Sequence, residues 1–131
     1  MRKALIGLAV VAVACMDDEI VGSTTLTGAY VLRTVNASPP PVTIAASGDN
    51  RTEVIDDVVT LFEGGGYAEN GHTRVTVNGQ STVEIISDSG HYSALSTSVS
   101  LTSSTGRIRV ATSDAKSMTI VEAGITWFYS K

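Results

Sequence analysis

From residue 26 onwards, apolar and polar residues alternate in short runs that are rich in Val, Ile and Thr. Such runs, separated by Gly, Asn, Asp and Ser, are typical of β-strands. Residues 51–62 come closest to a helical stripe, but their β-branched content and the glycines that follow favour one bent strand or two short ones. The pattern predicts strands at 27–36, 41–46, 51–62, 67–78, 80–87, 92–101, 107–112, 117–121 and 125–130.

The breaks between these runs predict hairpins between consecutive strands. Asn78-Gly79 indicates a type I′ turn, because both central residues of that turn need positive φ. Gly64-Gly65-Gly66 indicates a flexible hairpin turn. Short strands with one buried face fit an all-β, antiparallel up-and-down barrel of about eight strands, whose closure removes sheet edges. A two-sheet sandwich is the alternative.

Alternation also predicts the buried face of each strand. Ile108 and Val110 form one face of the 107–112 strand and are expected inside. Arg107 and Arg109 form the other face and are expected in water.

Aromatic residues follow the same rule. Trp127 and Tyr129 share a face of the last predicted strand, whereas Phe128 lies opposite, either packed outside against the prolines 39–41 or exposed. A Gly also precedes a Tyr by two positions at three strand starts, which would let the ring fill a barrel end; coincidence in a Gly-rich chain is the alternative. The three pairs are Gly28 and Tyr30, Gly65 and Tyr67, and Gly90 and Tyr92.

The start of the chain has the features of an export signal. Arg2 and Lys3 precede an apolar run of eleven residues, too short to cross a bilayer as a helix. Cys15, the only cysteine, ends the motif Ala12-Val13-Ala14-Cys15, which resembles the lipobox of bacterial lipoproteins. The resemblance implies lipidation of Cys15; an ordinary secretory signal with an incidental cysteine is the alternative.

This resemblance divides the chain into a signal peptide (1–14), a lipidated tether (15–25) and a barrel domain (26–131). A lone cysteine cannot form an internal disulfide, so the domain has no covalent crosslink. Met16 stands where many enterobacterial lipoproteins retained at the inner membrane carry aspartate, which favours the outer membrane of a bacterial envelope, on its periplasmic or surface side.

Residues 28–41 resemble the opening Gly-x-Tyr-x-Leu-x-x-Val-Asn-Gly-x-x-Leu-Pro of small bacterial lipoproteins with a lipocalin-like barrel. They read Gly28-Ala29-Tyr30-Val31-Leu32-Arg33-Thr34-Val35-Asn36-Ala37-Ser38-Pro39-Pro40-Pro41. Gly66-Tyr67, Gly90-His91-Tyr92 and Ser130-Lys131 follow in the family's order. Ala37 replaces the family's usual Gly, and Pro40 its usual Leu. The family has no settled activity, so the resemblance implies a fold and an envelope location only.

Charge and motifs narrow the function. The precursor carries a net charge of −4, and loss of Arg2 and Lys3 brings it to −6, with no basic cluster that would bind nucleic acid. His72 and His91 lack metal-ligand spacing, and no Gly-x-Ser-x-Gly elbow occurs. Asp56-Asp57 lacks the spacing of a calcium loop and is expected to be a solvated bend. We therefore expect a protein that is not an enzyme and carries no metal or cofactor.

Two hypotheses remain. The first is a membrane-anchored carrier that binds a small apolar ligand in the barrel. The second is an interaction, inhibitor or assembly module with a filled core, in which the Ser/Thr-rich stretch 93–105 offers hydroxyls to an envelope protein. Six residues are expected in the barrel interior: Tyr30, Leu32, Tyr67, Tyr92, Trp127 and Tyr129. In a carrier they would line the ligand site, whereas in an interaction module they would only fill the core.

Overall fold

The computed structural model describes residues 26–131, which form nine antiparallel strands and no helix that could span a membrane. The strands are β1 (Gly28–Val35), β2 (Val42–Ser47), β3 (Asn50–Leu61), β4 (Gly66–Val77), β5 (Gln80–Leu95), β6 (Ser98–Ser103), β7 (Ile108–Ser113), β8 (Ser117–Glu122) and β9 (Ile125–Ser130).

Eight of these strands close into a barrel. Each strand from β3 to β9 pairs with the next, and β1 pairs with both β9 and β3. β2 stays outside the closure, because it pairs only with β3. The up-and-down barrel is thus confirmed and the two-sheet sandwich is not formed.

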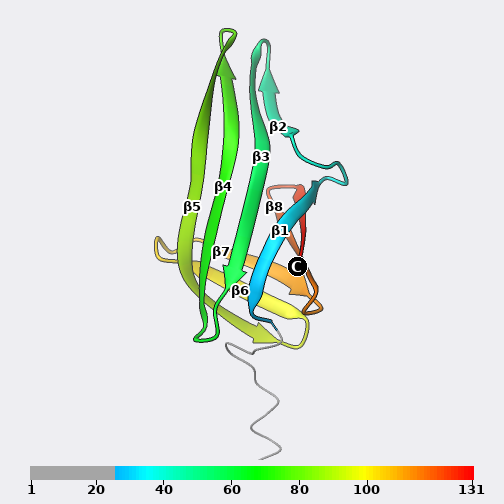
Figure 1. Cartoon of the computed structure of the whole chain (residues 1–131), viewed down its shortest axis with the longest axis vertical. Coiled ribbons are helices and arrows are strands. Elements are labelled where there is room, and N and C mark those ends of the chain that lie inside the picture. Colours follow the sequence, from blue (N-terminus) through cyan, green and yellow to red (C-terminus); the bar gives the residue numbers. More distant parts are fainter. Residues whose placement is uncertain (1–25) are drawn as a thin grey trace, which may run out of the picture.

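The upper parts of β2, β3, β4 and β5 project beyond the barrel as a sheet, which we call the arm (Figure 1). The segment predicted as one bent strand or two short ones is the single strand β3, with a register shift against β4 between Val54 and Asp56. A break predicted at 88–91 was wrong, since β5 continues to Leu95. β5 bends near Gly90. This residue pairs with both Tyr67 of β4 and Ser103 of β6, so β5 leaves β4 here and continues beside β6.

Several turns contain residues with positive φ, and two of them test the sequence analysis. Asn78 and Gly79 have φ values of 52° and 80°, which confirms the predicted turn. Asn36 and Ala37 adopt similar values, 49° and 70°, within a tight turn closed by reciprocal hydrogen bonds between Val35 and Ser38. Ala37 thus occupies a conformation that favours glycine.

We expect Ala37→Gly to raise the free energy of unfolding by about 1 kcal/mol, because it removes the left-handed strain of an L-residue. Urea unfolding followed by circular dichroism measures this change. Ala111→Gly, at a buried position of β7, is the control and should be destabilising. A loss of stability in Ala37→Gly would contradict the strain argument.

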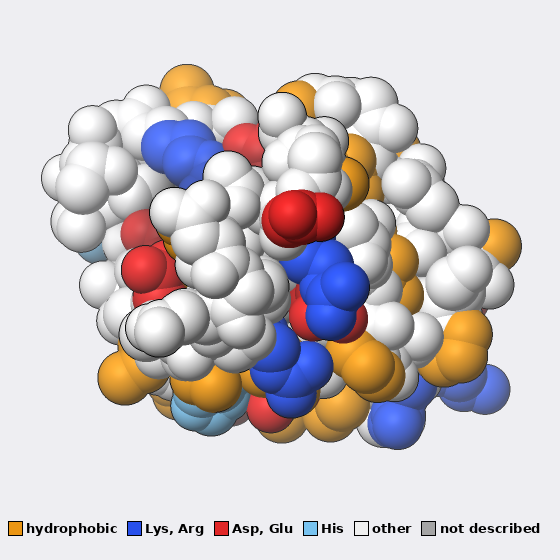
Figure 2. Space-filling model, turned by 90° about the horizontal axis from the view of Figure 1, so that it is seen from above, with side chains coloured by type: hydrophobic (Ala, Val, Ile, Leu, Met, Phe, Trp, Pro, Cys, Tyr) orange, Lys and Arg blue, Asp and Glu red, His pale blue; other side chains and the backbone are white. Residues whose placement is uncertain are grey.

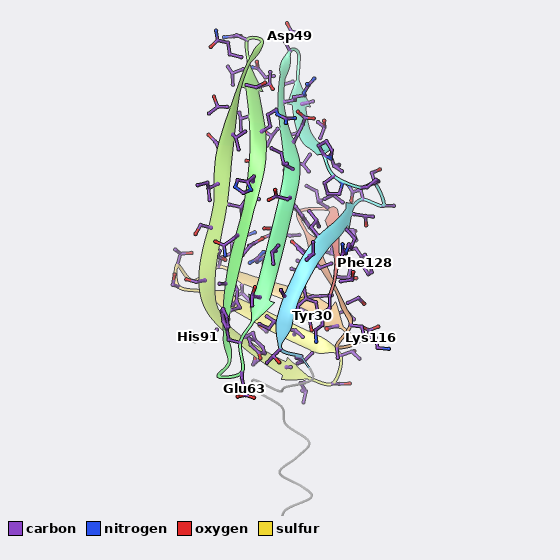
Figure 3. The ribbon with its side chains drawn as sticks, in the orientation of Figure 1. Tyr30, Asp49, Glu63, His91, Lys116 and Phe128 are labelled. Atoms are coloured by element: carbon purple, nitrogen blue, oxygen red, sulfur yellow. The ribbon has the colours of Figure 1, made fainter. Side chains whose placement is uncertain are left out.

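Tyrosines close the end of the barrel near Leu26. Tyr30 and Tyr92 are buried; the Tyr30 hydroxyl donates to the Leu26 carbonyl at 2.6 Å, and the Tyr92 hydroxyl donates to the Phe62 carbonyl at 2.9 Å. Figure 3 shows Tyr30 at the same end as Glu63 and His91, opposite Asp49 at the tip of the arm. The tyrosines of the Gly-x-Tyr recurrence are therefore core residues, as their spacing predicted.

The predicted orientation of β7 was wrong. Ile108 and Val110 are 64% and 59% exposed on the outer wall, whereas Arg109 is only 6% exposed and points inward. Alternation gives the period of a strand but not which face is buried. Arg109 faces inward because Glu69 and Asp88 pair with its guanidinium inside the barrel. Ala111, two residues further along the same face of β7, is buried as well. Phe128 is 37% exposed on the outer wall.

Candidate functional site

A cavity of about 90 Å³ lies at the barrel mouth, the end opposite the tyrosines, under the arm. Figure 2, which looks onto this end, shows acidic and basic side chains together in a hollow. Aliphatic and aromatic side chains form part of the wall and charged groups form the rest. The lining residues are Glu69, Ile86, Arg107, Arg109, Ile120, Glu122, Trp127 and Tyr129.

Arg109 is the centre of the charged wall. Its guanidinium lies 3.0 Å from Glu69 and 3.2 Å from Asp88, and it stands over the Tyr67 ring at 5.9 Å from the centroid. Burial alone would lower the pKa of Arg109, but the charge of Glu69 and hydrogen bonding with Tyr67 and Glu69 together raise it. Arg109 therefore stays charged, and removing one carboxylate would leave a buried charge without its full set of partners.

Asp88 anchors the cluster where β5 bends. Its carboxylate accepts hydrogen bonds from the hydroxyls of Tyr67 and Ser103, both at 2.9 Å. Burial alone would raise the pKa of Asp88, but these hydrogen bonds and the nearby Arg109 hold it below the usual value. Asp88 is thus ionised, and it ties β4, β5, β6 and β7 together.

Asp57, on β3, is a buried acid whose pKa is shifted in the opposite direction to that of Asp88. One of its oxygens accepts a hydrogen bond from the Tyr129 hydroxyl at 2.8 Å, whereas no donor among the described residues reaches the other, Oδ1. Burial and the adjacent Glu69 raise the pKa of Asp57 to about 9. Asp57 is therefore protonated at neutral pH, and its O–H can be donated to the Glu69 carboxylate.

Gly71 makes room for this acid. It pairs with Asp57 across β3 and β4, and a Cβ at position 71 would lie 2.5 Å from Asp57 Oδ1. The prediction that Asp56-Asp57 is a solvated bend was therefore wrong for Asp57, which is 1% exposed. Asp56 is exposed and its carboxylate lies 2.7 Å from Nδ1 of His72.

The rim of the cavity is formed by a second ion pair. Arg107 and Glu122 join the start of β7 to the end of β8 through two contacts. The hydrogen bond with Glu122 raises the pKa of Arg107, and the same contact lowers the pKa of Glu122. Trp127 is partly exposed beside this pair. The mouth therefore combines an aromatic surface with fixed charges.

Two of the predicted lining residues, Trp127 and Tyr129, line the cavity. The others, Tyr30, Leu32, Tyr67 and Tyr92, are buried in the core and do not line it. Sequence reasoning missed Glu69 and Arg109. The signal for Glu69 was its position two residues after Tyr67 and two before Gly71, on the same strand face.

Within residues 26–131, no three His, Cys, Asp or Glu side chains are placed to hold a metal ion. Cys15 and the lipobox lie outside the described residues.

Comparisons with models of protein families, with curated proteins and with solved structures found no match to this chain. The resemblance to small lipoproteins thus stays a prediction, and function is argued from the site.

Proposed function

We propose that this protein is a non-enzymatic binding protein of the bacterial envelope, anchored through a lipid on Cys15, that takes a small ligand into its barrel mouth. The cavity between Trp127 and the Arg109 cluster is the observation that carries the binding role. Mouths of β-barrels are common ligand sites, and such sites combine apolar walls with a few fixed polar groups.

The size and lining of the cavity define the ligand. At about 90 Å³ it is well below the roughly 300–1,000 Å³ of typical small-molecule sites. Below it, tyrosines and aliphatic side chains are buried in the barrel core, among them Tyr30, Tyr92, Leu101 and Met118. The site therefore suits a compact ligand, or one end of a longer one, with an apolar part against Trp127 and Ile86 and a hydrogen-bonding group toward Arg109.

Trp127 is the only tryptophan, so its fluorescence reports directly on the cavity. We expect at least one member of a panel of short-chain fatty acids and small quinones to change this fluorescence saturably in the purified full chain. Ile86→Phe should weaken that binding at least tenfold, because the larger ring occupies the cavity. Affinity is measured by titration of each variant.

Ile85→Phe is the matched control, since Ile85 is the adjacent residue of β5 and is 74% exposed. Its affinity should equal that of the unsubstituted chain. Equal weakening by both variants, or no saturable change with any compound, would refute the small-ligand role.

The anchor has its own test. We expect the full chain expressed in a bacterial host to incorporate labelled palmitate and to partition into a detergent phase. Cys15→Ala should lose both properties, because it removes the thiol that would be acylated. Label retained in Cys15→Ala would exclude lipidation at this residue. Ser23→Ala, in the predicted tether, is the control and should keep the label.

A further inference from the structure

One edge of the arm has no partner strand among the described residues. β5 pairs with β4 along Gln80–His91 but with β6 only from Gly90 onwards. The residues 80–85 are exposed on both faces of the arm, with Val83 56% and Ile85 74% exposed. The upper half of β5 therefore presents its edge and both faces to solvent.

The register of the hairpin identifies the free backbone groups. Val77 and Gln80 flank a two-residue turn and form its closing hydrogen-bonded pair, and hydrogen-bonded and non-bonded pairs then alternate along the ladder. Odd-numbered residues thus point their N–H and C=O groups away from β4. Ser89 follows this rule, since its carbonyl accepts the Ser104 N–H at 2.9 Å. The outward backbone groups of four residues have no neighbouring strand among residues 26–131: Ser81, Val83, Ile85 and Ser87.

This edge lacks the usual protection against pairing. Edge strands are commonly blunted by lysine, proline or a bulge. The residues 80–87 contain only one charge, Glu84, and no proline, and the β4–β5 register has no shift. The other free edge, on β2, follows the prolines 39–41 and has a register shift against β3. Only the β5 edge is therefore suited to an added strand.

We infer that the β5 edge pairs antiparallel with the same edge of a second copy of this chain, centred on Val83. In this register Val83 lies opposite Val83 of the second copy, and Ser81 lies opposite Ile85. Glu84 faces Thr82 and not another Glu84, so no like charges meet. The edge is thus complementary to itself, as a two-fold interface requires.

The barrels leave room for this arrangement. Ser89, where each barrel begins on this edge, lies beyond the Asn78-Gly79 turn of the other copy. A register centred on Ile85 would instead set Ser89 opposite Ser81, although the Ser89 carbonyl already accepts the Ser104 N–H. The Val83 register keeps both barrels intact and joins the two arms into one continuous sheet.

Disulfide trapping in native membranes tests this register in the full chain. Opposed residues of a hydrogen-bonded pair have Cα atoms about 5.5 Å apart, within disulfide range. We expect Val83→Cys to give an oxidant-dependent species of twice the chain mass that contains two differently tagged copies. Ile108→Cys, 64% exposed on the barrel wall, and the unsubstituted chain with Cys15 are controls and should give none.

A second variant tests the backbone pairing without a crosslink. Val83→Pro removes an N–H that points away from β4, so the hairpin keeps its internal bonds while the edge is blocked. Val83→Thr keeps that N–H. In nonionic detergent, sedimentation should show a dimer for Val83→Thr and a monomer for Val83→Pro, each with the circular dichroism spectrum of the unsubstituted chain. Monomers throughout, or a Val83→Cys crosslink only to a different protein, would overturn the inference.

Discussion

Replacement of Gly90 by alanine is expected to cost about 3 kcal/mol or more of the free energy of unfolding. A Cβ at this position would overlap the carbonyl oxygen of Thr102 and lie 2.9 Å from the Cα of Ser103. Both obstacles are backbone atoms of β6, which cannot rotate away. Urea unfolding followed by Trp127 fluorescence and circular dichroism measures the loss.

Gly64→Ala is the matched control, because a Cβ there meets no atom within 4 Å and its φ is not positive. Its stability should change by less than about 0.5 kcal/mol. If Gly90→Ala unfolds no more easily than Gly64→Ala, then β5 does not pass between its two neighbours at Gly90. A Gly90→Ala variant that does not fold at all would agree with the expected loss of stability.

The second large effect is a dependence of stability on pH caused by Asp57. In the unfolded chain an aspartate has a pKa of about 3.9. In the folded chain, burial and Glu69 raise the pKa of Asp57 to about 9. Between these values the folded chain holds one more proton than the unfolded chain. The free energy of unfolding should therefore fall by about 1.4 kcal/mol per pH unit between pH 5 and pH 8.

Asp57→Asn should remove this slope. Asparagine can still accept the Tyr129 hydrogen bond and can donate to Glu69 without binding a proton. We expect the variant to be more stable than the unsubstituted chain at pH 8 by about 2 kcal/mol or more. Denaturant unfolding at a series of pH values provides the measurement.

The same substitution at Asp49, exposed at the arm tip, is the control and should keep the slope (Figure 3). Carboxylates with lowered pKa, such as Asp88 and Glu122, have the opposite effect. The stability that they contribute is lost only as the pH falls through their lowered folded pKa values. This loss occurs below the range from pH 5 to pH 8 in which Asp57 is tested. An unsubstituted chain whose stability is flat from pH 5 to pH 8 would show that Asp57 is ionised in the fold.

Local sequence signals predicted the barrel because they act over a few residues. Turn chemistry placed the Asn78-Gly79 hairpin, and alternation placed most strand ends within a residue or two. β5 was divided wrongly because Asp88-Ser89-Gly90 has the composition of a turn. In the fold, Asp88 instead accepts hydrogen bonds from other strands, and no local pattern reveals such partners.

The candidate site was harder to predict for the same reason. Trp127 and Tyr129 were found because aromatic residues in the last strand are good lining candidates. Arg109 was assigned to water because a buried arginine is stable only where Glu69 and Asp88 meet it, and these come from β4 and β5. Asp57 was missed because its burial depends on the space opened by Gly71 on the neighbouring strand.

The tyrosine-filled end of the barrel would decide from which side the proposed ligand arrives. Tyr30 and Tyr92 close the barrel where residue 26 enters it, whereas the cavity beside Trp127 opens at the opposite end. In a chain tethered to a bilayer through the residues before 26, the closed end is the one joined to the tether. The proposed ligand would then arrive through water and would not pass directly from lipid into the barrel, so only compounds soluble enough to travel alone would reach the cavity.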